Sequence, residues 1–497
     1  MKTKHLITIV ASVALIGTVI GVGVYVRKEP EDYCKLIPLM RVADLDIGQL
    51  QTVELSNGAA ISVKLIDLHE VQDNVCNAVR RATVKVEVAG RVVSLVSSTY
   101  HLPVTAGAVQ IDCPVTQGYV QSSRQDNTWG LTKAARVRLW PADSPLIRPG
   151  TFVYPVKQRW FASDTQMANV PAFINGGEIP DEKGIYYHYG LDFGGAEGLV
   201  EVVAATDGQV ISSGTEVLPG YDDCPVFPRK DVIYILDDRG WFYRYSHFYE
   251  IDSSIKPGAQ VRMGQRLGLL GKEGIRSGWS HLHFDIKARQ PSGLWGTVNG
   301  YPFIWEAYQR QYQPEIIAVA RPHDISWAGE PVELDATRSW SRCGAIDKFE
   351  WTFCDGTAAT GPKVRRTYQK PGGYNEILKI TDARGNVDYD FAVVRILDKA
   401  NPDQTPPTIH AAYYPTFDIK PGDVLIFKAC TFRTTHGHET WDFGDGSPEV
   451  TVRSEVKAKV HNPQGYAVTK HAYRKPGDYL ASVRRTNEHG HQAITHL

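Results

Sequence analysis

The sequence lacks a net charge, because its 54 Lys and Arg residues are balanced by 55 Asp and Glu residues. Without an excess of positive charge, no global electrostatic field recruits nucleic acid or an anionic membrane surface. We therefore expect no nucleic-acid partner, and binding must come from local sites. A chain of 497 residues is too long for one hydrophobic core, so we expect a modular protein with about three or four domains.

Cysteine is sparse and unclustered. The seven cysteines include no CxxC pair, which argues against a structural zinc knuckle. Cys343 and Cys354 flank one short segment. They form either a disulfide or two buried thiols, and the spacing leaves both open.

An uncharged apolar run, LITIVASVALIGTVIGVGVYV, covers residues 6–26 and is long enough to cross a bilayer of about 30 Å. It is an export signal, a membrane anchor or both. Because a cleavable signal has an apolar region of only about 7–15 residues, we favour an uncleaved membrane-spanning helix within residues 1–30. Basic residues flank the run on both sides, so orientation stays open, and no cysteine directly follows it, which argues against a lipoprotein.

Helical patterns are rare in the rest of the chain. Residues 31–150 alternate apolar and polar positions in short runs such as ATVKVEVAGRVVSLV, which predicts a β-rich domain without a chemical motif. Residues 151–312 are again β-rich and contain many turn signals, and only residues 302–312 look helical. The predicted fold class is therefore mostly β.

The last third of the chain repeats itself. WTFCDG at 351–356 matches WDFGDG at 441–446, and YQKPGGY at 368–374 matches YRKPGDY at 473–479. Two copies of alternating strands and turns predict immunoglobulin-like β-sandwiches in tandem.

The predicted boundaries of these two sandwiches are residues 313–398 and 408–497, joined by a linker at 399–407. Both copies resemble PKD repeats, modules of exported proteins. The resemblance implies a spacer or a binder of cell-surface glycan or protein, although Thr352 and Cys354 depart from the motif in the first copy.

Two histidines lie two residues apart in the β-prone segment GWSHLHFDI at residues 278–286. Alternate residues of a strand point to the same side, so His281 and His283 project from one face. Two neutral imidazoles there can meet a metal, or one can bind it while the other handles protons. Alone, such a pair is more often an ordinary structural feature.

The pair is not alone, because YYHYGLDFGG supplies His188 and Asp192, with Gly190 between them. The glycines and aromatics favour a strand entering a turn, which lets an imidazole and a carboxylate converge. Zinc held by two histidines and one carboxylate keeps its fourth position for water, the pattern of catalytic sites. Another candidate, His247, lies in the aromatic segment WFYRYSHFYEI.

In order, the chain reads H-x-G-x-D, A-x-D-G-x-V, Y-x-H, P-G-x-x-V-x-x-G-Q-x-L-G and H-L-H-F-D. This series resembles the lysostaphin-type and LytM-like zinc metallopeptidases, which cut peptidoglycan cross-bridges. The resemblance implies one zinc ion per chain, held by His188, Asp192 and His283. It also implies that His247 and His281 lie beside the attacking water.

Two departures from the family pattern remove no proposed ligand. Ser280 stands where the family often has Pro, and Asp285 where it often has Glu. Two weaker candidates are a second HxH pair, His436 and His438, which we interpret as surface histidines, and Asp207, which we interpret as a turn residue.

The sequence therefore predicts an exported zinc endopeptidase of the cell envelope, acting on peptidoglycan peptides. We expect it to be anchored in the cytoplasmic membrane, or secreted if residues 6–26 are cleaved off. Two alternatives remain: a zinc-stabilised, non-catalytic scaffold or regulator of other hydrolases, and a protease of exported proteins.

Overall fold

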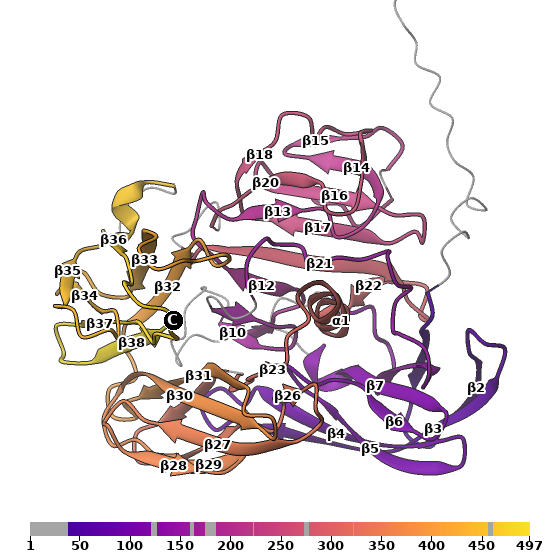
Figure 1. Ribbon diagram of the computed structural model, residues 1–497. Coiled ribbons are helices and arrows are strands. Elements are labelled where there is room, and N and C mark those ends of the chain that lie inside the picture. Colours follow the sequence, from indigo (N-terminus) through magenta and orange to yellow (C-terminus); the bar gives the residue numbers. More distant parts are fainter. Residues whose placement is uncertain are drawn as a thin grey trace, which may run out of the picture.

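A computed structural model describes residues 38–497 except for short segments, namely residues 121–126, 160–163, 174–184, 222, 273–277, 322 and 456–460. The fold is mostly β with one short α helix. Four units are distinguished here by residue range: the N-terminal unit (38–150), the central unit (151–312), the first repeat (313–398) and the second repeat (408–497). In Figure 1 the central unit lies at the top, the N-terminal unit at the lower right, the first repeat at the lower left and the second repeat at the left.

The predicted fold class requires one correction, which concerns the N-terminal membrane-spanning helix. Residues 6–26 lie outside the described residues, and no described helix is long and apolar enough to cross a bilayer. The α helix of the described chain, α1 (Tyr301–Tyr312), has 12 residues. At 1.5 Å per residue it is about 18 Å long, well short of a bilayer of about 30 Å.

The N-terminal unit consists of two four-stranded antiparallel sheets, ordered β1-β8-β7-β6 and β2-β3-β4-β5. Alternating apolar side chains of both sheets meet in one core, as strand periodicity predicts. The elements are β1 (Arg41–Leu45), β2 (Leu50–Glu54), β3 (Ala60–Gln72), β4 (Val79–Val88), β5 (Arg91–Ser97), β6 (Val104–Ala106), β7 (Val109–Thr116), η2 (Gln117–Tyr119) and β8 (Ala135–Pro141).

The central unit is built on a nine-stranded sheet whose main path is β15-β14-β16-β17-β21-β12-β9. Two small sheets, β13-β20-β18 and β10-β11, complete it. Its strands are β9 (Thr165–Gln166), β10 (Pro171–Phe173), β11 (Ile185–Tyr187), β12 (Leu191–Gly194), β13 (Glu201–Val203), β14 (Gly208–Ser213), β15 (Glu216–Val217), β16 (Val232–Leu236), β17 (Phe242–Ser246), β18 (Phe248–Ile251), β19 (Gln260–Val261), β20 (Arg266–Leu270), β21 (His281–Arg289) and β22 (Trp295–Val298).

The two repeats each have a core of their own, centred on Trp351 in the first and on Trp441 in the second. The first contains β23 (Ile316–Ile317), β24 (Asp324–Trp327), β25 (Pro331–Asp335), β26 (Trp340–Ser341), β27 (Ile346–Thr352), β28 (Ala358–Thr360), β29 (Lys363–Thr367), β30 (Gly372–Asp382) and β31 (Val387–Leu397). The second contains β32 (Thr408–Tyr414), β33 (Leu425–Phe432), β34 (Glu439–Asp442), β35 (Val450–Val452), η3 (Pro463–Gly465), β36 (Ala467–His471), β37 (Ser482–Thr486) and β38 (Gln492–His496).

The two repeats are joined to each other by strand pairing. Strand β30 of the first pairs in parallel with β38 of the second through Gly373 and Ala493, which joins both into one sheet path. In Figure 1 the second repeat lies at the left, next to both the first repeat and the central unit.

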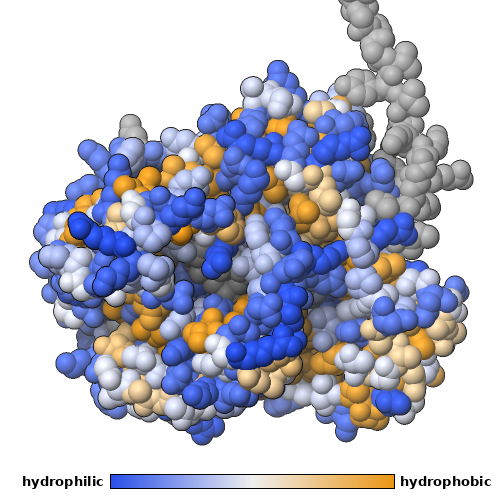
Figure 2. All heavy atoms as spheres, in the orientation of Figure 1, coloured by the Kyte–Doolittle hydropathy of each residue, from blue (hydrophilic) through white to orange (hydrophobic). Residues whose placement is uncertain are grey.

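Exposed large apolar side chains are scattered over the described surface, and Ile47, Leu50 and Val92 of the N-terminal unit are among them. On the face seen in Figure 2, hydrophilic and hydrophobic residues are interspersed. Single exposed apolar residues are normal for a soluble surface and indicate no particular partner.

A buried arginine ties the first repeat to the central unit. Arg321 is 2% exposed; its Nε lies 3.2 Å from Asp390 Oδ1, and its Nη1 donates to Thr165 Oγ1 at 3.0 Å. Because Asp390 is itself fully buried, it depends on this cation for compensation. Breaking a buried ion pair from one side is strongly destabilising.

We predict that Arg321→Met lowers the free energy of unfolding by about 3–5 kcal/mol, because it leaves the Asp390 carboxylate buried without its counter-charge. Chemical denaturation measures the change. Arg365→Met is the matched control, since the Arg365 side chain is 80% exposed and its loss should cost at most about 1 kcal/mol. Equal stability of the two variants would contradict the assignment.

Candidate metal centre

The pairing of β12 with β21 brings the two sequence motifs together. Asp192 lies directly opposite His283 in this antiparallel pair, and Gly194 lies opposite His281. Directly opposed side chains of an antiparallel pair share one face. On the other side of β21, Ser246 of β17 is opposite His283. The HxH pair is thus on a central strand, as its β-prone sequence predicts.

His188 reaches the same place from the short segment before β12. Its backbone is fixed on both sides, because its N–H donates to Val170 O at 2.9 Å and its carbonyl accepts from Asn169 N at 2.7 Å. Gly190 follows closely: a Cβ at this position would lie 2.6 Å from Cε1 of His283. The glycine of H-x-G-x-D therefore makes room for the His283 ring.

Three donor atoms converge at this point. His188 Nε2 lies 3.0 Å from His283 Nδ1, which lies 2.9 Å from Asp192 Oδ1, and His188 Nε2 lies 3.2 Å from the same oxygen. All three side chains are buried. Ligands of tetrahedral zinc, each about 2.0–2.2 Å from the ion, are separated by roughly 3.4 Å. Two imidazoles and one carboxylate thus fit a zinc ion in both spacing and chemistry.

The charges of this group are coupled. Burial opposes ionisation of Asp192, but the neighbouring His188 and His281 outweigh that effect and hold the pKa of Asp192 well below its ordinary value. Burial also lowers the pKa of His283, whereas the adjacent carboxylates of Asp192 and Asp285 raise it, with a net increase. A carboxylate that stays ionised is ready to act as a metal ligand.

Asp285 supports His283 from behind. His283 Nε2 lies 3.3 Å from Asp285 Oδ2, and Asp285 is 2% exposed. Arg244 Nη1 lies 3.5 Å from the same oxygen, and Arg244 Nη1 also donates to Tyr189 Oη at 2.9 Å. A carboxylate on the second ring nitrogen fixes the tautomer and orientation of a ligating histidine.

His281 and His247 form a second pair beside the three donor atoms. Their ring centroids are 4.7 Å apart, and His281 Nε2 lies 3.6 Å from Asp192 Oδ2. His281 Nδ1 lies 2.9 Å from the carbonyl oxygen of Trp279. Because that carbonyl can only accept, the proton is on Nδ1, and Nε2 is free to accept another proton.

His247 occupies a constrained position between β17 and β18, with a φ of 73°, where non-glycine residues are uncommon. Its Nδ1 lies 3.3 Å from Asp231 Oδ2 and 3.1 Å from Arg229 Nη2. Arg229 and Asp231 are themselves paired. These two charged residues orient the ring, and no motif in the sequence marked either of them.

The structure brings all five candidate residues to one place: His188, Asp192, His247, His281 and His283. Sequence reasoning missed Asp285 as a partner, although it continues the same alternation as His281 and His283 along one strand face. It missed Asp231 and Arg229 because they are distant in sequence from His247.

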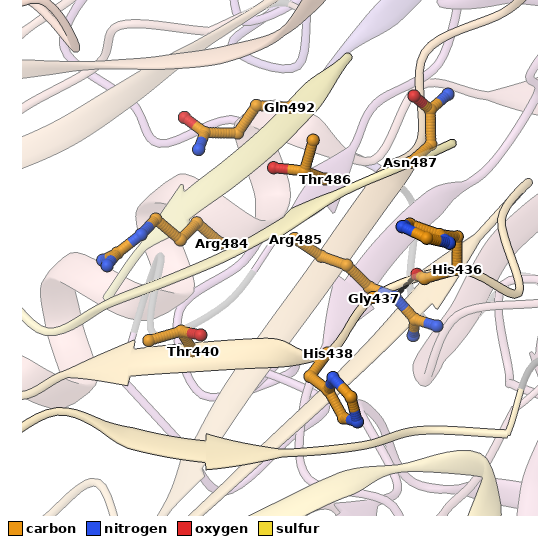
Figure 3. A pocket seen from close by; sticks show the side chains of 9 residues that line it. All are labelled: His436, Gly437, His438, Thr440, Arg484, Arg485, Thr486, Asn487 and Gln492. Carbon is orange, nitrogen blue, oxygen red and sulfur yellow. Dashed lines mark hydrogen bonds between the residues drawn. The ribbon is translucent and has the colours of Figure 1, made fainter. Parts of the chain in front are cut away.

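The weaker candidates lie elsewhere. His436 and His438 line an open polar pocket of the second repeat, of about 220 Å³, together with Arg484 and Asn487; Figure 3 shows them there without any of the five residues. Asp207 accepts a hydrogen bond from Met263 N at 2.6 Å, in keeping with a turn residue. Cys343 and Cys354 are free thiols rather than a bridge.

Comparison with known proteins agrees with this geometry. Residues 186–293 match peptidase family M23, and residues 313–396 and 419–496 match the PKD domain. The chain therefore carries an M23 peptidase domain followed by two PKD domains. The predicted resemblance to LytM-like metallopeptidases and PKD repeats is thereby confirmed. The M23 domain indicates a peptidase, and both domain types together indicate an extracellular or cell-envelope protein. M23 peptidases are generally zinc-dependent.

Individual relatives are distant. A catalytic domain mutant of the prophage-encoded M23 protein EnpA from Enterococcus faecalis is 20% identical and covers 33% of this chain and 96% of that chain, with a TM-score of 0.19. Csd3 of Helicobacter pylori is 15% identical over 53% of this chain and 82% of that chain, with a TM-score of 0.21. At such scores these likenesses carry no argument about function.

A curated relative is Collagenase ColA of Clostridium perfringens, 24% identical over 150 residues. The match covers 30% of this chain but only 13% of the collagenase, so it concerns a small part of that protein.

We predict that His247 and His281 stay neutral down to acidic pH in the metal-free protein. Burial lowers the pKa of His247 to about 4 and that of His281 to about 3. Because an unfolded histidine titrates near 6.5, the unfolded chain binds these protons first, so stability is present above pH 6.5 and is lost as pH falls towards 4.

The measurement is NMR of ring-labelled histidines, with the signal of each residue assigned by its loss in a His→Gln variant. Two signals that show no titration between pH 8 and pH 5 are expected. A midpoint near 6.5 for either residue would contradict the burial described here.

Proposed function

We propose that the protein is an exported, zinc-dependent endopeptidase that hydrolyses peptide bonds in peptidoglycan cross-links. The observation that carries this proposal is the convergence of three buried donor atoms within 3.2 Å of one another, inside a domain that matches the M23 peptidases. Two histidines and one carboxylate leave a coordination position open, which is typical of catalytic rather than structural zinc.

His188 Nε2, Asp192 Oδ1 and His283 Nδ1 would hold the ion. When bound there, zinc supplies a Lewis acid for the scissile carbonyl and a nucleophilic water at neutral pH. Asp285 keeps His283 in the tautomer that presents Nδ1 to the metal, since its carboxylate lies against Nε2.

Proton transfer is the proposed role of His281, and stabilisation of the oxyanion is the proposed role of His247. The free Nε2 of His281 lies on the side of Asp192, where it can accept a proton from the attacking water. His247 packs on His281 and can donate a hydrogen bond to the oxyanion that develops on the carbonyl. The lowered pKa values keep both rings in the neutral form at neutral pH, in which each ring has one N–H to donate and one nitrogen that can accept.

Two other functions use the same residues. A zinc-stabilised scaffold or regulator of other hydrolases would bind the metal without turnover. A protease of exported proteins would cleave folded or unfolded protein rather than cell-wall peptide. The intact set of five residues favours an enzyme over the scaffold.

The test is digestion of purified peptidoglycan with the full chain, followed by mass spectrometry of the released fragments. New termini at cross-link peptides, absent with His188→Ala, support the proposal. Unchanged peptidoglycan together with cleavage of casein would favour the protein protease, and inertness towards both with zinc bound would favour the scaffold.

We predict that the wild-type protein binds about one zinc per chain, and that His188→Ala and His283→Ala each lose it, because two remaining ligands hold zinc weakly. Elemental analysis after gel filtration measures the content. His438→Ala serves as the control, since this residue is exposed and lies outside the cluster. Full zinc in either ligand variant would refute the ligand assignment.

His247→Ala and His281→Ala should keep their zinc and lose about 10²–10⁴-fold in turnover, the range expected when a positioned acid–base or oxyanion group is removed. The assay pairs zinc content and thermal unfolding with the cleavage rate of a cross-link peptide. Zinc-loaded, folded variants with a near wild-type rate would show that both rings merely pack.

Asp285→Asn should weaken zinc affinity by about 10–100-fold, as expected when the outer partner of a ligating histidine is changed. Competition with a chelator measures the dissociation constant. Unchanged affinity would mean that the Asp285 carboxylate only balances the positive charge of Arg244 and does not support His283 as a ligand.

A further inference from the structure

The second repeat reaches the site through a stack of three rings. Trp279 lies against the His281 ring on one side, with centroids 4.4 Å apart and planes inclined by 22°. Its ring also stacks with His410 of β32, at 5.0 Å and 19°. Figure 1 shows β32 near the end of β21 that carries His281. His410, which lies 129 positions after His281 in the sequence, is thus linked to this proposed proton carrier by one intervening side chain, that of Trp279.

His410 is held in place by the central unit. Its Nδ1 lies 2.7 Å from Asp164 Oδ2, and Asp164 is 8% exposed. The backbone carbonyl of Asp164 accepts from Gly194 N at 2.8 Å, at the end of the strand that carries Asp192. The His410 ring therefore has a fixed partner on an element joined to the metal centre.

Asp164 is also the meeting point of three units. Arg321 Nη1 and His323 Nε2 of the first repeat lie 3.7 Å and 3.9 Å from its Oδ1. The carboxylate thus faces two residues of the first repeat and one of the second. Such a buried, shared anion fixes the relative placement of the groups around it better than an exposed pair would.

Further contacts surround the same edge of the site. Lys428 Nζ donates to Glu197 O at 2.9 Å, and the Glu197 carboxylate pairs with His461. Lys428 and Lys272 lie over the Tyr466 ring at 4.3 Å and 5.0 Å. Lys272 belongs to the central unit and pairs with Ser280, directly between Trp279 and His281. The contact therefore involves the segment that leads into the HxH pair.

We propose that the second repeat completes the active site, and that His410 is a positioning residue that holds Trp279 flat against His281. This inference rests on the proposed function. Trp279 contacts His281 twice, through its ring and through the carbonyl that accepts the Nδ1 proton. A shift of Trp279 therefore changes both the orientation of the imidazole and the atom that fixes its tautomer.

This proposal differs from the expectation that the PKD-like tail is only a spacer or a binder. It also differs from a blocking role, in which the second repeat would cover the site and lower activity. Loss of a positioning contact lowers turnover, whereas loss of a blocking contact raises it.

The experiment compares His410→Ala with His410→Phe in the full chain. His410→Ala should lower kcat by about ten- to hundredfold with zinc content and KM nearly unchanged, since small misplacement of a catalytic group has effects of this size. His410→Phe keeps a flat ring against Trp279 without the Asp164 bond and should recover most of that loss. His438→Ala, an exposed histidine of the same repeat, should behave as wild type.

A second readout does not depend on activity. Hydrogen exchange of the peptide covering residues 278–286 should become faster in His410→Ala, less so in His410→Phe, and not at all in His438→Ala. The exchange measurement remains informative if His410→Ala is less stable than the wild type. His410→Phe also lacks the hydrogen bond to Asp164 but keeps a ring against Trp279, so the difference between the two variants reports on the ring contact.

The outcomes separate the two claims. If the wild-type protein cleaves nothing but the exchange pattern changes as expected, the proposed function fails while the contact stands. If wild type is active and His410→Ala leaves kcat and exchange unchanged, the positioning role is wrong. Faster cleavage by His410→Ala would also overturn it and would assign a blocking role to the second repeat.

Discussion

The register between β12 and β21 is the constraint on which the site depends. It places Asp192 opposite His283 and keeps both on one face. A slip of one residue would turn every side chain of one strand to the other face, which would separate the carboxylate from both imidazoles. Burial then makes this arrangement electrostatically demanding, because an ionised carboxylate away from water needs cationic or metal compensation. The same features that fix the geometry therefore prepare it for a metal ion.

The other units stabilise the elements that carry these residues. Tyr187, next to His188, belongs to the core of the N-terminal unit, and its Oη accepts from Val79 N at 2.8 Å. Asp164, next to the strand that pairs with β12, meets both repeats. The N-terminal unit, which has no chemical motif of its own, thus contributes to the site by fixing the position of the residue that precedes His188. The N-terminal unit and both repeats therefore all contact segments of the central unit that lie next to the candidate metal centre.

Much of the site could be predicted from the sequence because it depends on local rules. Strand alternation places His281 and His283 on one face, and the ordered series of motifs identifies His188 and Asp192 as their partners. Asp231 and His410 could not be predicted in the same way, since tertiary packing alone brings Asp231 to His247 and His410 to Trp279. Asp285 follows from the same alternation as His281 and His283, but alternation alone does not show that its carboxylate lies against the His283 ring. The helix expected at residues 6–26 was inferred from hydropathy, and the described part of the chain contains no such helix.

The most direct test of the central claim is a crystal structure of the zinc-loaded protein with anomalous diffraction at the zinc edge. We expect one strong anomalous peak about 2.0–2.2 Å from His188 Nε2, Asp192 Oδ1 and His283 Nδ1, with His281 and His247 nearby but not coordinating. A peak bonded to His281 in place of His283, or zinc bound only at another place in the protein, would contradict it.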